Sequence, residues 1–456
     1  MLSPRLVFLG FLYLSFPVHA QSGLSLEEPP AWVEPTPVAR AGAPSAEDAV
    51  AGLYRLLTET QVRVGPEWNE RYVRQVRQVM NARGVETGSK FEITYAHAYE
   101  RLRLHGLWRT RDGVRTQVLR AEDLKLLQRE QELEQGIYNE ERTVVAFLAD
   151  VRVGDVLEEA YTLEEAHPLF RGQYMDTVLL VDKEPTRQRV FRLLAPASLT
   201  LHFKTLGAPP FAPTEHERGA LREYRWEQHD VGAFSSEDNL PPDLAFWPQV
   251  RISSYGSWAE VATWALALEE ALPVSPEVKA QADTWRALPT EEARFLAATR
   301  FVQDEVRYLG LEIGANTHQS HPPGQVFAQR FGDCKDKALL LAVLLRELGL
   351  PAHVALVNTR YQHGVASMLP SAWIFDHAIV RARVAGRTEW VDATLTHQRG
   401  RLGARTAPPF GQALAIAPGV TQLETLAQPP LDGPTEDVRY TLSLEDSGAG
   451  TLVVDV

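Results

Sequence analysis

An apolar run of eight residues, ALLLAVLL at positions 338–345, most constrains how this chain can fold. The run lies between Asp333, a residue type favoured just before a helix, and Gly349, a favoured helix stop, with Pro351 beyond it. Because the apolar residues would cover nearly every face of such a helix, it must lie inside a core and not on a surface. We therefore predict a central core helix with Cys334 in its first turn.

Cys334 is the only cysteine in the chain of 456 residues, so no disulfide can form within it. The positive end of the helix dipole, together with Lys335 and Lys337, favours the thiolate form, whereas Asp333 and Asp336 oppose it. A thiol at a rigid helix start, beside backbone N–H groups that can receive an oxyanion, is placed as a nucleophile should be. Taken alone, a single cysteine of this kind is a buried inert thiol, an intermolecular link or a reactive nucleophile.

A base and its orienting group are available in DHAIVRARVAGRTEWVDAT, residues 376–394. His377 opens one predicted strand and Asp392 lies in the next, with a tight turn near residues 385–386. The expected register pairs Val384 with Arg387, and alternate residues of a strand share a face. His377 and Asp392 should therefore lie on the same side of a hairpin.

With a thiol, an imidazole and a carboxylate in these places, the chain has the three parts of a nucleophilic triad. Cys334 would be the nucleophile, and His377 would take its proton and later protonate the leaving amine. Asp392 would hold the imidazole in the required tautomer. These three residues are the predicted catalytic site.

Two different patterns precede this region. Residues 49–82 are expected to be helical, with a helix at NERYVRQVRQVMNA. Residues 90–235 hold many short segments rich in β-branched and aromatic residues between turn signals, which predicts an antiparallel sheet or sandwich. NLPPDLAFWPQVRISSYGSW, residues 239–258, is interpreted as a linker, and the last 19 residues as a hairpin.

The first twenty residues, MLSPRLVFLGFLYLSFPVHA, predict a secretory signal peptide. They have a basic start at Arg5, an apolar run over residues 6–16 and small residues at Val18 and Ala20. That run is too short to span a bilayer, and no later stretch reaches the roughly 18 apolar residues that a membrane helix needs. We expect an exported protein, periplasmic or secreted. The Pro- and Ala-rich residues 21–48 are expected to form a mobile leader.

A formal net charge of −13 argues against nucleic acid or an anionic membrane as the main partner, because both require a basic surface. No metal and no cofactor is predicted. His318 and His321 lie in a Pro-bearing loop without a familiar ligand spacing, so we interpret them as a wall of the cleft.

Three segments, GDCKDKALLLAVLLRELGLPAHVALV, DHAIVRARV and EWVDAT, resemble the core of the transglutaminase-like superfamily. VRYLGLEIGANTHQSHPPGQVFAQRFGDCKDKA and ADVRVGDVLEEAYTL resemble a bacterial branch in which that core follows a β-rich domain of unknown function, family 3857. The resemblance implies a papain-like α+β core with Cys at a core-helix N-terminus packed on an antiparallel sheet. It also implies a second oxyanion donor upstream, for which Tyr308, Asn316 and Gln319 are the candidates.

Together these features predict an α+β chain with a β-rich N-terminal domain and a transglutaminase-like core. The expected division is a signal peptide (1–20), a leader (21–48), the β-rich domain (49–245), the core (246–430) and the start of a further β domain (431–456). The predicted function is a cysteine enzyme that acts on amide bonds of a peptide or protein substrate through a thioester, with water or an amine as acceptor. The alternative is a catalytically silent binding module of the cell envelope, with an envelope protein as partner.

Overall fold

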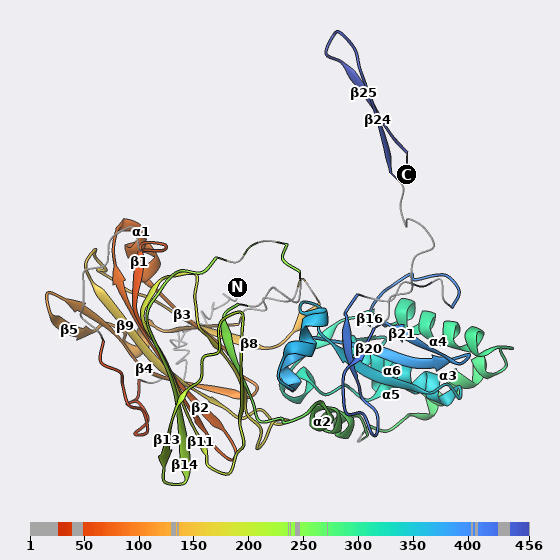
Figure 1. Ribbon diagram of the computed structural model, residues 1–456, viewed down its shortest axis with the longest axis horizontal. Helices are drawn as coiled ribbons and strands as arrows, with labels where there is room; N and C mark the ends of the chain where they lie inside the picture. Colours follow the sequence, from red (N-terminus) through yellow and green to blue (C-terminus); the bar gives the residue numbers. More distant parts are fainter. Residues whose placement is uncertain are drawn as a thin grey trace, which may run out of the picture.

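The computed structural model describes residues 26–38, 49–128, 134, 136–235, 237, 239–241, 247–270, 272–402, 405, 409–426 and 438–455. Figure 1 shows two parts side by side, with the hairpin of β24 (Arg439–Leu444) and β25 (Gly450–Asp455) projecting from them. The predicted terminal hairpin is thus confirmed, and all of its residues are exposed. The predicted signal peptide lies outside the described residues. None of the helices described combines the length and apolar composition needed to cross a membrane.

The N-terminal part is β-rich, as predicted, and holds one large sheet and two small ones. The large sheet has the order β13-β14-β11-β1-β2-β9-β4-β5, and its neighbours are antiparallel except for the parallel pair β1 and β11. The small sheets have the orders β10-β15-β12 and β3-β8-β6. The strands and the short helix of this part are β1 (Leu53–Val64), β2 (Asn69–Val79), α1 (Ala82–Gly88), β3 (Lys90–Ala96), β4 (Glu100–Arg111), β5 (Val114–Gln117), β6 (Lys125–Gln128), β7 (Ile137–Tyr138), β8 (Glu141–Phe147), β9 (Val156–Glu165), β10 (Met175–Leu179), β11 (Thr186–Pro196), β12 (His202–Leu206), β13 (Thr214–Arg218), β14 (Leu221–Val231) and β15 (Gln249–Ser253).

Two hydrophobic cores join the small sheets to the large one. Val62, Leu193 and Trp226 of the large sheet pack with Val250 and other residues of the β10-β15-β12 sheet. A second core joins residues of β4 to residues of β3 and β8. Sheets stacked in this way form a sandwich, which was one of the two predicted arrangements.

The helical prediction for residues 49–82 is wrong for most of its length, because β1 and β2 form an antiparallel pair there. Val73, Val76 and Val79 have the spacing of three that suggests one face of a helix, and all are buried. They point to alternate faces of the large sheet, and both faces are covered: Val76 packs with Leu57 on one side, whereas Val79 packs in a separate cluster. Burial on both faces removes the polar–apolar alternation that would have marked a strand.

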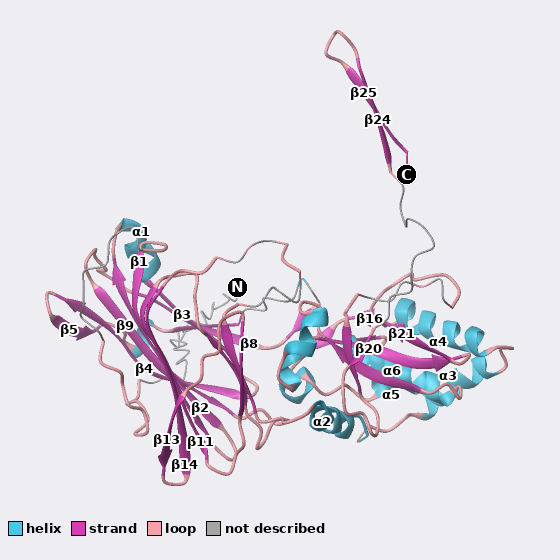
Figure 2. Cartoon of the chain, viewed as in Figure 1, coloured by secondary structure: helices cyan, strands magenta, loops and turns pink. Residues whose placement is uncertain are grey.

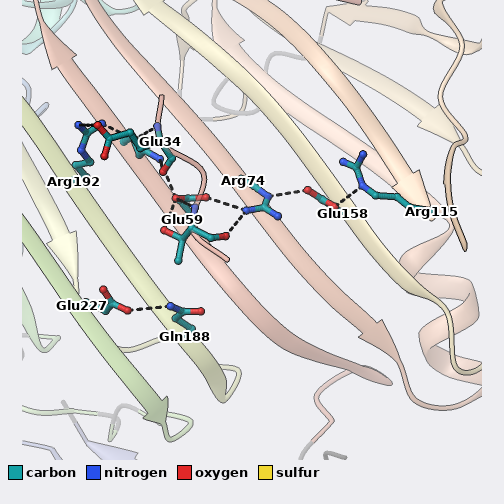
Figure 3. A network of polar contacts seen from close by, with 10 residues as sticks. Glu34, Glu59, Arg74, Arg115, Glu158, Gln188, Arg192 and Glu227 are labelled. Atoms are coloured by element: carbon teal, nitrogen blue, oxygen red, sulfur yellow. Dashed lines mark hydrogen bonds and ion pairs between the residues drawn. The ribbon is translucent and has the colours of Figure 1, made fainter. Parts of the chain in front are cut away.

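The expectation of a mobile leader is also wrong for residues 26–38, which lie against the large sheet. The backbone N–H and hydroxyl of Thr36 donate to the buried Glu59 carboxylate at 2.9 and 2.7 Å. Gln61 and Glu34 exchange hydrogen bonds, and the buried Arg192 donates to Glu34. Figure 3 shows how these contacts continue across the strands through Arg74, which is bound to Glu59 and Glu158. The segment thereby covers charged side chains that an open sheet would leave in water.

The segment expected as a linker, residues 239–258, contains β15, the central strand of the β10-β15-β12 sheet. Val250 and Ile252 of β15 are buried in the N-terminal core. The β-rich part therefore reaches Ser253 and does not end at residue 245.

The C-terminal part is an α+β core built around α6, and Figure 2 shows that helices α2 to α6 gather there. A five-stranded antiparallel sheet, β21-β20-β19-β22-β23, lies against α6. The elements of this part are α2 (Trp258–Glu270), α3 (Pro276–Arg286), α4 (Glu291–Glu305), β16 (Arg307–Tyr308), β17 (Gly310–Leu311), α5 (Pro323–Gln329), β18 (Phe331–Gly332), α6 (Cys334–Glu347), β19 (Ala352–Val357), β20 (His377–Val384), β21 (Arg387–Val391), β22 (Gln412–Ala415) and β23 (Glu424–Thr425).

The predicted burial of the apolar run is confirmed, since every residue from Lys335 to Leu345 is buried. Residues of α3, α4, α5 and the sheet share one core with α6. Such a helix is held on all sides, so its first residue has a fixed position.

The two parts meet in a short parallel ladder between β7 and β17. The backbone N–H groups of Gly310 and Glu312 donate to the carbonyls of Gly136 and Tyr138 at 2.7 and 2.9 Å. Nearby, the Trp264 indole donates to the Leu169 carbonyl at 3.1 Å. The N-terminal part is therefore bonded directly to the segment that leads into the Cys334 region.

Candidate active site

Cys334 is the first residue of α6, and the local sequence explains why the helix starts there. Asp333 accepts a hydrogen bond from the Asp336 backbone N–H, and Asp336 accepts one from the Asp333 backbone N–H, which makes a capping box. Gly332 permits this contact, because a Cβ at that position would lie 2.6 Å from the Cβ of Asp336. Cys334 itself is partly exposed between buried neighbours. Its backbone N–H belongs to the first turn, which has no acceptor within the helix.

His377 and Asp392 lie together, as the predicted hairpin requires. Val384 pairs with Arg387, in the predicted register, and the turn residues Ala385 and Gly386 have positive φ angles. His377 opens β20 and Asp392 directly follows β21. The His377 Nε2 lies 2.9 Å from the Asp392 Oδ2, and both side chains are largely buried.

The electrostatics of the pair favour a charged imidazole. Burial alone would lower the pKa of His377, but hydrogen bonds to Asp392 and Cys334 and the charges on both raise it to about 10. Burial would raise the pKa of Asp392, but the hydrogen bond and charge of His377 and two bonds from Thr394 hold it below its usual value. Since Nε2 faces Asp392, Nδ1 is the ring nitrogen left for the thiol.

Asp392 accepts further hydrogen bonds from Thr394 and Gln303, two residues that were not predicted from the sequence as part of the site. The backbone N–H and the hydroxyl of Thr394 donate to the Asp392 Oδ1 at 2.8 and 2.7 Å. The buried Gln303 amide donates to the Asp392 carbonyl at 2.8 Å. An Asp followed two residues later by Thr is a signal for such a turn, whereas nothing in the sequence points to Gln303, which lies 89 residues away.

Cys334 and His377 line one cavity of about 340 Å³. Its walls come from α2, the loop after β17, α6, β19 and the start of β20, and Ile137 of β7 adds a side chain from the N-terminal part. The volume is within the range of small-ligand pockets. Access to the thiol is therefore shaped by both parts of the chain.

Of the three upstream candidates for an oxyanion donor, only Tyr308 lines this cavity. Burial raises the pKa of the Tyr308 phenol, and so do the charges on Cys334 and Asp333, so the hydroxyl keeps its proton. The Asn316 amide instead contacts His321 at 3.0 Å, and Gln319 is not among the residues that line the cavity.

The histidines of the Pro-bearing loop have different surroundings. His318 lines the cavity, as predicted, and burial lowers its pKa to about 3. His321 instead contacts the Asp336 carboxylate through Nδ1 at 3.0 Å and donates its backbone N–H to it at 2.7 Å. Within the described ranges, no group of three His, Cys, Asp or Glu side chains could hold a metal ion.

The ammonium of Lys335, the residue after Cys334, lies beside two carboxylates. Its ammonium contacts the Asp333 carboxylate and lies 3.7 Å from the Glu312 carboxylate. Burial disfavours its charge, but those two carboxylates raise the pKa of Lys335 to about 12. The expected positive charge beside Cys334 is therefore present and is balanced by two negative ones.

Two regions of the chain match known protein families. Residues 69–235 match the model of DUF3857, a domain of unknown function with a solved structure, and residues 279–395 match the model of the transglutaminase-like superfamily. No curated protein matches the chain.

Among solved structures, a "putative protease" from Parabacteroides distasonis aligns with a TM-score of 0.66 at 15% identity, over 84% of this chain and 73% of that one. At this identity the likeness shows the fold. A "putative cysteine protease" from Cytophaga hutchinsonii covers 88% of this chain and all of its own at 11% identity, with a TM-score of 0.19. An M1 zinc metallopeptidase from Deinococcus radiodurans covers 44% of this chain and 42% of its own at 14% identity, with a TM-score of 0.24. The last two values are too low to carry an argument.

The order of the two matched regions agrees with the order that the sequence motifs predicted. Cys334, His377 and Asp392 all fall within the second region. The chain therefore carries a DUF3857 domain followed by a domain of the transglutaminase-like superfamily.

Proposed function

We propose that the chain is an exported cysteine enzyme that cleaves or transfers acyl groups of amide substrates through a thioester. The observation that carries this proposal is the bond between His377 and Asp392, with His377 lining the same cavity as Cys334. A hydrogen bond and a charge from Cys334 are among the causes that raise the pKa of His377, which supports direct contact between the two side chains.

The chemistry follows from this arrangement. The Cys334 sulfur attacks the amide carbonyl carbon, and the negative charge moves to the carbonyl oxygen. The Cys334 backbone N–H and the Tyr308 hydroxyl are the groups available to stabilise that oxyanion. The carbon–nitrogen bond then breaks, and the amine leaves with the proton held by His377.

A thioester remains on Cys334 after this step. Water or a second amine then attacks it, His377 takes the proton of the attacking group, and the thiolate leaves. Attack by water gives an acid, as in a peptidase or amidase, and attack by an amine gives a new amide. Both routes use the same three residues, and the acceptor decides between them.

The test is alkylation of the purified protein with iodoacetamide from pH 5 to 9, followed by intact mass. The wild type should be labelled faster than a free-thiol reference below pH ~8.5, the pKa of an ordinary thiol. H377A and D392N should lose that advantage. D376N is the matched control, because Asp376 precedes His377 and lines the cavity but its carboxylate binds Thr359. Equally slow labelling of the wild type and both variants would refute the paired nucleophile and favour a binding module.

Export is tested separately, since the predicted signal peptide covers residues 1–20. The protein recovered from a periplasmic or culture fraction should begin at Gln21 on N-terminal sequencing. Recovery of an uncut chain from the cytoplasm would contradict export without bearing on the chemistry of the site.

A further inference from the structure

Three carboxylates line the Cys334 cavity, and their partners differ. Glu312 lies 3.7 Å from the Lys335 ammonium. Asp376 accepts hydrogen bonds from the backbone N–H and the hydroxyl of Thr359 at 2.7 and 3.0 Å. Glu269, in contrast, has no hydrogen bond or ion pair through its carboxylate with any residue that the structure describes. One acidic group of the cavity is therefore left for a ligand.

The position of Glu269 is unfavourable for a carboxylate in the absence of a ligand. It lies in the last turn of α2, where the negative end of the helix dipole disfavours a negative charge. Burial raises the pKa of Glu269 to about 7, and the charge of Arg346 offsets this only in part. A glutamine of the same shape would avoid both penalties and would lose only the partial compensation from Arg346. Shifted acids of this kind gather at functional sites.

The cavity that holds Glu269 and the thiol has apolar side chains as well as polar ones in its wall. Trp264, Leu268, Leu356 and Phe375 are among the apolar ones. An apolar stem fits such walls, and a positive group at its end would pair with the carboxylate. The combination describes a primary ammonium or guanidinium on an alkyl chain, as in a lysine or arginine side chain.

On this basis we propose that Glu269 is a specificity residue that holds a cationic group of the substrate, carried on an apolar stem, in the same cavity as Cys334. The proposal rests on the proposed function in one respect, because the bound cation is part of a substrate only if Cys334 is a nucleophile. The cation site itself depends only on the cavity and Glu269.

The groups that face Glu269 determine how the site responds to pH. Arg346 of α6 and His353 of β19 line an adjoining cavity of about 330 Å³, which Glu269 also lines. The other titratable residues that line the Cys334 cavity are Tyr308, Glu312, His318, Lys335, Asp376 and His377. Lys335 and His377 keep their positive charges near pH 7, because their pKa values are raised to about 12 and about 10. Burial and the charges of Arg346 and Arg381 lower the pKa of His353, and burial lowers that of His318, so both are neutral near pH 7. The change in charge near pH 7 should therefore come from Glu269.

The experiment compares two ligands of nearly the same size, n-butylammonium and 1-butanol. Both are titrated into the full-length C334S protein, and binding is followed by ligand-observed NMR at pH 8. The ammonium should bind about tenfold more tightly than the alcohol, as expected for one partly screened charge pair. In C334S/E269Q the two should bind within about twofold of each other. C334S/E277Q is the matched control, because Glu277 makes the same change of charge on the exposed surface of α3.

A second arm repeats the titrations at pH 6, where Glu269 takes up a proton and the preference should shrink. A preference that is absent at pH 8, or that survives unchanged in C334S/E269Q, would overturn the inference. Because the thiol has been removed, these outcomes do not depend on catalysis. If iodoacetamide labelling is slow but the preference for the ammonium depends on Glu269, the proposed enzyme activity is refuted and the cation site remains.

Discussion

His377 and Asp392, fifteen residues apart in the chain, are joined by a bond of 2.9 Å from Nε2 to Oδ2. The bond exists because the β20 and β21 hairpin brings both residues together on the sheet that packs against the Cys334 helix. The other carboxylate oxygen is held by Thr394. Asp392 is thus fixed through both oxygens, and the imidazole takes its direction from it.

The Thr394 hydroxyl should matter for reactivity more than for folding. T394V removes the bond to the Asp392 Oδ1 and leaves the carboxylate freer to rotate away from His377. We expect iodoacetamide labelling at pH 7 to slow by roughly tenfold, since a hydrogen bond to a charged group contributes about 1.5 kcal/mol or more. T394S keeps the hydroxyl and should label at the wild-type rate. Equal rates for T394V and the wild type would show that the backbone contact alone positions Asp392.

His377 should make the stability of the protein depend on pH. Its pKa is about 10 in the folded state and near 6.5 in an unfolded chain. The folded state therefore binds the proton more tightly, so the resulting stabilisation is complete below pH ~6.5 and disappears as pH rises through about 10. The wild type should lose stability relative to H377Q over this window.

The measurement is the denaturation midpoint of both proteins from pH 6 to 10.5. A parallel NMR titration of the imidazole protons should show His377 still charged at pH 8, and a lower pKa in D392N. Midpoints that stay parallel across the window would contradict the raised pKa.

Some of this arrangement could be predicted because its signals are local. Asp333, Gly349 and the apolar run between them specify α6 within about 20 residues, and the short turn at 385–386 specifies the register of the hairpin. The Cys334, His377 and Asp392 prediction depends on these two elements. These short-range signals were enough to predict that His377 and Asp392 lie together.

Other features depend on contacts that no local pattern encodes. The sequence of β2 predicts a helix because its buried valines are three residues apart. They are all buried because both faces of the sheet are covered. The composition of residues 26–38 is that of a mobile leader, but two residues buried in the large sheet hold the segment in place. Glu59 accepts a hydrogen bond from it and Arg192 donates one to it. Tyr308 and Glu269 join the site only because their elements form walls of one cavity.

Lys337 should affect stability with the opposite sign to His377. Its ammonium is fully buried and donates to the Val306 carbonyl at 2.5 Å. Burial lowers its pKa from 10.5 to about 8, although the charges of Asp392 and Asp304 act against this. Between pH 8 and 10.5 the unfolded chain binds more protons at this residue, so the stability of the wild type relative to K337M should rise with pH, by up to roughly 3 kcal/mol.

K279M, on the exposed surface of α3, should show the same rise relative to K337M as the wild type does. The comparison uses the denaturation midpoint of the three proteins from pH 7 to 10.5. A wild type and a K337M variant with the same pH dependence would show that the Lys337 ammonium is not penalised by burial.

Ile137 tests whether the DUF3857 part helps to select what reaches the thiol. It belongs to β7, which pairs with β17, and its side chain lines the Cys334 cavity. I137W should fill part of that cavity without touching the triad. Labelling by iodoacetamide should stay within about twofold of wild type, whereas labelling by a bulkier reagent, N-benzyl iodoacetamide, should slow by roughly tenfold or more, because overpacking a filled site is costly. I137V, which leaves the cavity open, should label at the wild-type rate with both reagents.

If I137W slows both reagents equally, the substitution has displaced β17 and the residues that lead to Cys334. If it slows neither, the N-terminal part does not restrict access, and selection rests on residues of the transglutaminase-like domain.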